Sequence, residues 1–279
     1  MKKGLEKILW VLFLLSIAVL TVDAIGIHFM ADFIRSQGFF YFMVSFPVLL
    51  LILHSIWAMG YYRTFLFILI ASATGLIFEV IGVNHTSVFG GSYIYKNIGF
   101  MIFNVPLLVP IYWSVFIYVG YTLTSSFLFW INRDKPNKFK KDIILMILMI
   151  LLDGLLVTGI DVFMDPLQVK EGTWTWIEKG PYYGIPIGNF IGWFAVTIIS
   201  VSLFRTFEYY YPQKSANADR SIFIMPVASY GMFCIHFISY ALAYKMPELV
   251  LIGTFVMMPV VIANLILFAN WKLYHRKNE

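Results

Sequence analysis

The sequence has little charge, a single cysteine and no loop typical of a nucleotide or redox cofactor. Only 13% of its 279 residues are charged, roughly half the share in a soluble domain, whereas 60% are hydrophobic. A lone Cys234 cannot form a disulfide within the chain or a thiolate metal site, so we interpret it as an apolar packing residue. These shortages exclude a disordered chain, a nucleic-acid-binding protein and a disulfide-rich ectodomain.

Sequence support for metal and cofactor chemistry is also missing. No Gly-x-Gly-x-x-Gly loop and no Walker loop occurs. The histidines are too scattered to form the histidine box of a di-iron enzyme; they are His28, His54, His85, His236 and His275. We interpret His54 and His236 as packing residues with satisfied ring nitrogens. Any reaction is therefore expected to use protons and water, with no metal and no cofactor.

The apolar residues come in runs of about 20, the length of a helix that crosses a bilayer. They predict an all-α polytopic integral membrane protein with eight transmembrane helices in a single domain over residues 1–279. The expected helices are 8–28, 39–59, 64–83, 104–131, 142–163, 185–206, 221–244 and 248–271. The alternative for the first run is a signal peptide cleaved near Val22-Asp23-Ala24, but further apolar residues follow that run.

Basic residues are unevenly distributed between the segments that join these helices. With a cytoplasmic amino terminus, the inner segments hold Lys2, Lys3, Lys7, Arg63, Arg133, Lys135, Lys138, Lys140, Lys141, Arg205, Lys214, Arg220, Lys272, Arg276 and Lys277. The outer segments hold only Arg35, Lys96, Lys170, Lys179 and Lys245. Positive charge favours the cytoplasmic side, so we predict a multi-pass protein of the cell membrane with both termini cytoplasmic.

Part of the sequence repeats at a shift of about 80 residues. Gly-Ser-Tyr-Ile-Tyr at 91–95 aligns with Gly-Thr-Trp-Thr-Trp at 172–176. The other aligned pairs are Glu79 with Asp161, Val105-Pro106 with Ile185-Pro186, and Trp113 with Trp193. The predicted units, 64–131 and 142–207, are two parallel helical hairpins related by an axis along the membrane normal. The alternative is a chance resemblance between aromatic loops at the membrane interface.

Several acidic residues fall within or at the end of apolar spans, where each costs a few kcal/mol unless it is paired or protonated. They are Asp23, Glu79, Asp153, Asp161 and Asp165. All except Asp153 are expected near the outer ends of their helices, which favours one shared polar site. Asp161 and Asp165 share a helical face, and Asp165 is expected to close its helix before Pro166. For Asp23, a hydrogen bond to a neighbouring helix is the alternative.

In combination, these motifs resemble the carotenoid-biosynthesis membrane family of CruF-type hydratases. The resemblance covers residues 75–195 best, and its motifs are Phe78-Glu79, Phe89 with 90–95, Val105-Pro106 with Pro110 and Trp113, 161–166, and Gly184-Ile185-Pro186 with Asn189 and Trp193. It implies cofactor-free hydration of the terminal carbon–carbon double bond of an acyclic carotenoid, such as bisanhydrobacterioruberin or a lycopene-like chain. The implied partners are that carotenoid, the lipid bilayer and other membrane enzymes of the pathway, with no nucleic acid.

Hydration of such an alkene needs an acid that protonates carbon, stabilisation of a tertiary cation, and a base that deprotonates water. Glu79 and Asp161 are the principal catalytic candidates, followed by Asp165 and Asp23; the sequence does not show which of them is the acid. The candidates for the substrate and cation site are Tyr93, Tyr95, Trp174, Trp176, Asn84 and Asn189. The alternatives are an interfacial aromatic belt for the four aromatic residues, and loop-backbone hydrogen bonds for the two asparagines.

Two other functions stay open. The Asp-x-x-x-Asp spacing of Asp161 and Asp165 could hold magnesium and pyrophosphate in an intramembrane prenyltransferase, although only one such motif occurs. Alternatively, the carboxylates relay protons or bind a cation in a transporter or lipid-binding protein. The inner half of the bundle is expected to contain few polar residues besides Asp153 and His54, which counts against a transport path through it. Small residues of the spans either make room for a polyene or allow close helix contact; they are Gly75, Gly82, Gly154 and Gly159.

Overall fold

The computed structural model describes residues 2–29, 33, 36–85, 90–96, 99–131, 142–212 and 220–278. In these residues, eight helices are long and apolar enough to cross a membrane. They are α1 (Lys2–His28), α2 (Gln37–Met59), α3 (Tyr61–Asn84), α4 (Leu108–Ile131), α5 (Ile143–Glu171), α6 (Ile187–Tyr210), α7 (Ile224–Ala243), which follows the short 3-10 helix η2 (Arg220–Phe223), and α8 (Pro247–Asn278). The chain is an all-helical polytopic membrane protein, as the sequence predicts.

The largest boundary difference concerns α5, which continues through Pro166 to Glu171. The prediction that Asp165 closes this helix was wrong. A proline inside a helix leaves the carbonyl four residues earlier without its usual donor, and here the Tyr182 hydroxyl donates to the Val162 carbonyl at 3.0 Å. The helix ends instead at Gly172, which adopts the left-handed conformation (φ 78°) that favours glycine.

α4 begins four residues later than predicted and α6 two residues later, and the loops before both helices contain short strands. They are β1 (Tyr93–Tyr95), β2 (Met101–Ile102), β3 (Val105–Pro106) and β4 (Trp174–Trp176). β2 and β3 form an antiparallel hairpin. Its two turn residues, Phe103 and Asn104, both have positive φ, as tight hairpin turns require.

The two sequence motifs that align with each other also contact each other. β1 pairs antiparallel with β4, with Ile94 opposite Thr175 and each tyrosine of β1 opposite a tryptophan of β4. The aligned Trp113 and Trp193 lie with their ring centroids 4.2 Å apart. Such contacts between counterparts are what a twofold arrangement would produce, while the repeat units themselves stay a prediction.

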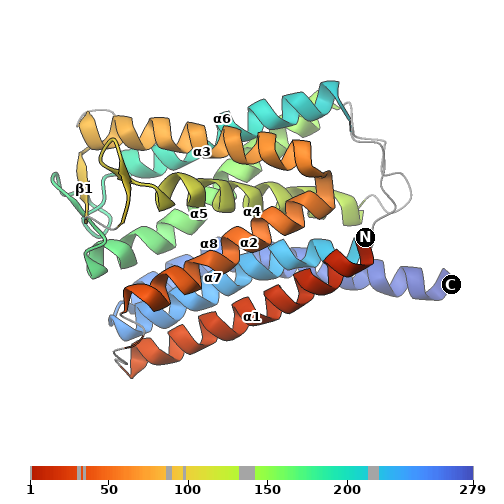
Figure 1. Ribbon diagram of the computed structural model, residues 1–279, viewed down its shortest axis with the longest axis horizontal. Coiled ribbons are helices and arrows are strands. Elements are labelled where there is room, and N and C mark those ends of the chain that lie inside the picture. The colour runs from red at the N-terminus through yellow and green to blue at the C-terminus, as the bar shows by residue number, and fades with distance from the viewer. Residues whose placement is uncertain are drawn as a thin grey trace.

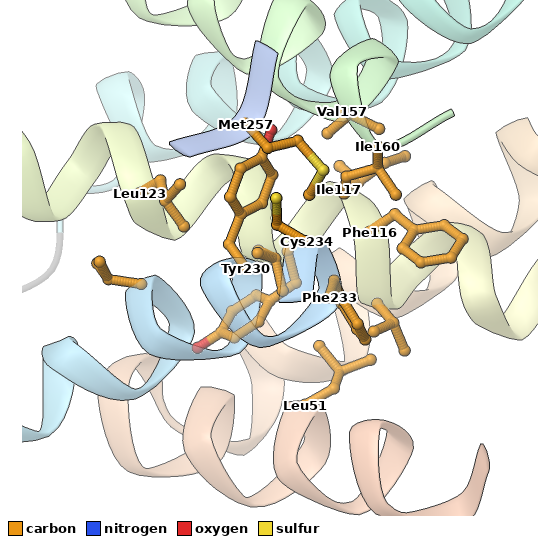
Figure 2. Packing of buried hydrophobic residues seen from close by; sticks show 14 of the residues in the cluster. Leu51, Phe116, Ile117, Leu123, Val157, Ile160, Tyr230, Phe233, Cys234 and Met257 are labelled. Atoms are coloured by element: carbon orange, nitrogen blue, oxygen red, sulfur yellow. The ribbon is translucent and has the colours of Figure 1, made fainter. Parts of the chain in front are cut away.

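The helices form two groups that meet along α4 (Figure 1). α3, α4, α5 and α6 pack against one another. On the other side, α7 and α8 pack on α4 and α5, α2 packs on α3 and α4, and α1 packs on α2 and α7. Between the groups, Tyr230 and Cys234 of α7 pack with Ile117 of α4 and Val157 of α5 (Figure 2). Cys234 is fully buried in this cluster, which confirms its interpretation as a packing residue.

Both chain termini lie at one end of the bundle, and β1 lies at the other (Figure 1). We call these the terminal end and the loop end. This placement agrees with an even number of spans; that the terminal end faces the cytoplasm stays a prediction. Some residues used in the sequence arguments lie outside the described part of the chain; they are Arg35, Phe89, Arg133, Lys135, Lys138, Lys140, Lys141 and Lys214.

Three of the four span glycines mark close helix contacts. A Cβ atom at Gly75 would lie 2.4 Å from the side chain of Trp113, and one at Gly154 would lie 2.7 Å from Phe194. A Cβ atom at Gly159 would meet a side chain of α8 at 2.8 Å. The structure therefore favours helix packing over space for a polyene at these positions; Gly82 is buried within α3.

Candidate active site

A cavity of about 470 Å³ lies at the loop end, where α2 to α7 meet β1 and β4. Most of its wall is aliphatic or aromatic. Acidic and amide groups are confined to one part of the wall, where α3, α5 and α6 contribute Glu79, Asp161, Asp165, Gln168 and Asn189. No lysine or arginine occurs among the described residues that line the cavity.

Glu79 accepts three hydrogen bonds inside this cavity. The Tyr93 and Tyr95 hydroxyls each donate to its Oε2 at 2.6 Å, and Nε1 of Trp113 donates to its Oε1 at 2.8 Å. Burial and the neighbouring Glu79 raise the pKa of both tyrosine hydroxyls well above their ordinary value, so they stay protonated donors. A carboxylate has about four acceptor positions. The three donors therefore leave one acceptor position of Glu79 for a further donor.

Asp161 and Asp165 share one hydrogen-bond donor. Nδ2 of Asn189 lies 2.7 Å from Oδ2 of Asp161 and 2.8 Å from Oδ2 of Asp165. Nε1 of Trp174 donates to Oδ1 of Asp165. In contrast, Oδ1 of Asp161 is buried and has no hydrogen-bond partner among the described residues. Other buried polar atoms of the described residues also lack a partner, and two of them belong to the cavity wall. Oδ1 of Asp161 is thus one of several atoms of this cavity that could form a hydrogen bond with a ligand or a reacting group.

Most of the predicted site residues come together here. The cavity is lined by Glu79, Asp161, Asp165, Tyr93, Tyr95, Trp174, Trp176 and Asn189. Three of the aromatic side chains also form hydrogen bonds with the carboxyl groups: Tyr93 and Tyr95 donate to Glu79, and Trp174 donates to Asp165. The shared helical face predicted for Asp161 and Asp165 is confirmed by their common donor.

The structure does not bring Asp23 and Asn84 to the cavity. Asn84 is exposed at the end of α3 and donates to the Val80 carbonyl of its own helix at 2.7 Å. Asp23 is buried where α1 packs on α7, and the helices that α1 mainly contacts are α2 and α7. There its Oδ2 accepts a hydrogen bond from the Tyr240 hydroxyl at 2.8 Å and lies 3.6 Å from Nε2 of His236. Asp23 thus forms a hydrogen bond to a neighbouring helix, which the sequence analysis gave as the alternative to a catalytic role.

Sequence reasoning missed Trp113 and Trp193 as site residues. The repeat alignment had singled out both, and their equivalent positions were the available signal. Of the histidines, His54 is confirmed as a satisfied packing residue, since its Nδ1 lies 2.6 Å from the Tyr118 hydroxyl and its Nε2 lies 3.3 Å from the Ile222 carbonyl. The same prediction was wrong for His236, because it lines the cavity next to Asp23 and its buried Nδ1 has no hydrogen-bond partner among the described residues.

A second buried polar cluster lies toward the terminal end. Nε of Arg205 donates to Oδ2 of Asp153 at 2.8 Å, and Nη2 of Arg205 forms an ion pair with the same oxygen at 2.7 Å. The Thr124 hydroxyl donates to Oδ1 of Asp153 at 2.5 Å. Nearby, the Tyr121 hydroxyl donates to Glu208 at 2.7 Å. The expectation that this half holds little polar beyond Asp153 and His54 was wrong, because Arg205 and Glu208 belong to α6 and were read as the helix end or the following loop.

Comparison with family models matches residues 38–260 to a family described as carotenoid biosynthesis protein. The matched range includes Glu79, Asp161, Asp165 and Asn189. No curated protein and no solved structure matches the chain.

Proposed function

This chain belongs to the carotenoid biosynthesis protein family, and on that basis we propose that it is a carotenoid hydratase. The reaction is the addition of water, without a cofactor, to the terminal double bond of an acyclic carotenoid of the bisanhydrobacterioruberin or lycopene type. The observation that carries this proposal is the free, buried Oδ1 of Asp161 in a mostly apolar cavity that also holds the hydrogen-bonded Glu79.

Asp161 is proposed as the acid. Its side chain and that of Asp165 accept from the same amide group, and two negative charges so close would repel each other strongly in an apolar setting. One proton held by the pair removes this repulsion. If Asp161 carries it, the free Oδ1 can deliver the proton to the less substituted carbon of the terminal double bond, leaving a tertiary cation on the neighbouring carbon.

Glu79 is proposed as the anion that stabilises this cation and as the base. Its three donors hold it in place, and its remaining acceptor position can take a hydrogen bond from water. The water oxygen attacks the tertiary carbon, and its proton passes to Glu79. Return of a proton from Glu79 to the aspartate pair resets the site, so the net change is one water added. The indole rings of Trp113 and Trp193 offer aromatic faces next to this position.

The test is expression in a bacterial host that produces an acyclic carotenoid, followed by chromatography and mass spectrometry of the pigments. The expected product is heavier by one or two waters and has an unchanged chromophore, because an isolated terminal double bond is not part of the conjugated system. In membranes assayed in deuterium oxide, each hydration should place one non-exchangeable deuterium on carbon. Two different linear carotenoids left unchanged by verified protein would contradict the proposal.

The alternatives predict different outcomes in the same assay. A free carboxylate oxygen next to a second aspartate is also what a magnesium-binding prenyltransferase would need, and such an enzyme would require prenyl diphosphate and be inhibited by a chelator. A transporter or lipid-binding protein would leave the pigment chemically unchanged. Hydration that persists with a chelator and without prenyl diphosphate would separate the three functions.

A further inference from the structure

A narrow space, which we call the channel, adjoins the active-site cavity toward the middle of the bundle. It has a volume of about 50 Å³ and lies between α1, α2, α4 and α7. Leu20, Pro47 and Phe233 line both the channel and the larger cavity, so the two spaces are adjacent and these side chains lie at their boundary. Phe233 belongs to the packed cluster between the helix groups that Figure 2 shows.

The combined space is long and follows the helix axes. On α2, lining residues extend from Phe40 near the loop end to His54, a separation of fourteen residues that corresponds to about 21 Å of helix rise. On α7 they extend from Phe237 to Met225, or about 18 Å. The hydrocarbon core of a bilayer is roughly 30 Å thick. A chain in this space therefore runs along the membrane normal for much of that thickness.

The channel is narrow and mostly apolar. Its lining is mostly aliphatic and aromatic, with side chains such as Phe13, Ile17, Leu50 and Met225. At the end farthest from the carboxyl groups, the ring nitrogens of His54 are engaged by Tyr118 and by a backbone carbonyl, so this histidine offers no free polar group there. Such a space suits an extended apolar chain better than a polar lipid headgroup.

We propose that this channel binds the part of the polyene chain that follows the reacting end, with the reacting end at Asp161 and the chain directed toward His54. The inference rests on the proposed function and deepens it, because it names where the chain beyond the reacting end lies. Cavity and channel are adjacent, and only the loop end carries carboxyl groups. A linear carotenoid is the occupant that uses both parts at once.

The test compares two tryptophan substitutions at adjacent positions of α2. Leu50 lines the channel, whereas Leu49 is 42% exposed on the outer face of the bundle. With Leu50→Trp we expect at least a tenfold loss of hydration of a linear tetraterpenoid carotenoid. A linear ten-carbon terpene with the same terminal double bond, whose chain is too short to reach Leu50, should be hydrated within about twofold of the wild-type rate. Leu49→Trp should leave both rates unchanged. Activity on the short terpene also shows that the variant has folded.

A second variant changes a residue in the opposite wall of the channel. Ser229 lines it from α7, and Ser229→Leu should shift the preference in the same direction with a smaller added volume. Equal effects on both substrates, or no effect of either Leu50→Trp or Ser229→Leu, would overturn the channel. If the wild type hydrates neither substrate, the hydratase function fails first. The channel is then tested by the tetraterpenoid that copurifies per protein, which should fall with Leu50→Trp and not with Leu49→Trp; an equal amount in both overturns the channel too.

Discussion

The two ends of the helix bundle both bury carboxyl groups but surround them differently. Toward the terminal end, Asp153 lies against Arg205 and Thr124 and is fully buried. At the loop end, Asp161 is 1% exposed, has a second aspartate as its neighbour and keeps one oxygen free. The first group is closed by a cation and packed side chains, whereas the second faces an open cavity without a lysine or arginine among its described lining residues.

This contrast separates a structural use of buried acids from a chemical one. An ion pair in an apolar interior is stable only when both charges stay together, because either charge alone is poorly solvated. The Asp153–Arg205 pair meets that condition, and both oxygens of Asp153 are already engaged within the cluster. An acid without a cation must hold a proton or remain ready to exchange one. Substitutions should therefore affect mainly stability at one end and mainly activity at the other.

The largest effect is expected for the loop-end carboxyl groups. Asp161→Asn and Glu79→Gln keep the side-chain shape but remove the proposed acid and the proposed base, and loss of such a group lowers rates about 10²- to 10⁴-fold. The measurement is the ratio of hydrated to unhydrated pigment per amount of protein in the membrane. Thermal unfolding in detergent should be unchanged. Full activity of both variants would remove the proposed mechanism.

The terminal-end pair should show the opposite behaviour. Arg205→Met leaves Asp153 charged and unpaired in the interior, which is expected to reduce the free energy of unfolding by about 3–5 kcal/mol. The double variant Asp153→Leu with Arg205→Met should recover much of that loss, because no charge is left buried. The stability of the single and the double variant is measured by unfolding in detergent, and their activity is measured as hydrated pigment per amount of folded protein. A loss of hydration in the double variant at normal stability would show that this cluster also serves the reaction.

A smaller effect is expected from a matched pair of asparagines. Asn189→Ala removes the donor shared by Asp161 and Asp165, and a lost hydrogen bond to a charged group corresponds to about a ten- to hundredfold lower rate. Asn84→Ala removes only a contact within α3 and should change hydration by less than about twofold. Similar losses in both variants would mean that the position of Asn189 between the aspartates is not important.

The smallest effect concerns the loop that carries β1. Oε2 of Glu178 accepts a hydrogen bond from the Ser92 backbone N–H at 2.7 Å, and this bond lowers the pKa of the Glu178 carboxyl. A lowered pKa in the folded state stabilises the loop above the ordinary glutamate value near about 4.3, and the stabilisation is lost as the pH falls through the lowered value. Limited proteolysis of the loop should therefore accelerate only under strongly acidic conditions. Glu178→Gln should weaken this pH dependence, and a variant with an unchanged profile would exclude the contact as its cause.

Several features of the site could be predicted from local sequence. Glu79, Asp161 and Asp165 stand out because acidic groups are rare in apolar spans, and the aromatic motifs at 93–95 and 174–176 stand out because they align. The chain does place these groups around one cavity. That the tyrosines and Trp174 donate to the carboxyl groups could not be predicted, because a hydrogen bond between a strand and a helix depends on their relative position.

The sequence by itself determined the class of the protein, because eight apolar runs long enough to cross a bilayer leave few other folds for this chain. It also determined which carboxyl groups need an explanation. Only the tertiary structure decided their partners: Asp23 faces α7 while Asp161 faces the cavity, and Asp153 pairs with Arg205 across a helix interface. The physical reason is that hydropathy depends on each residue and its near neighbours in sequence, whereas burial with or without a partner depends on which helices pack together.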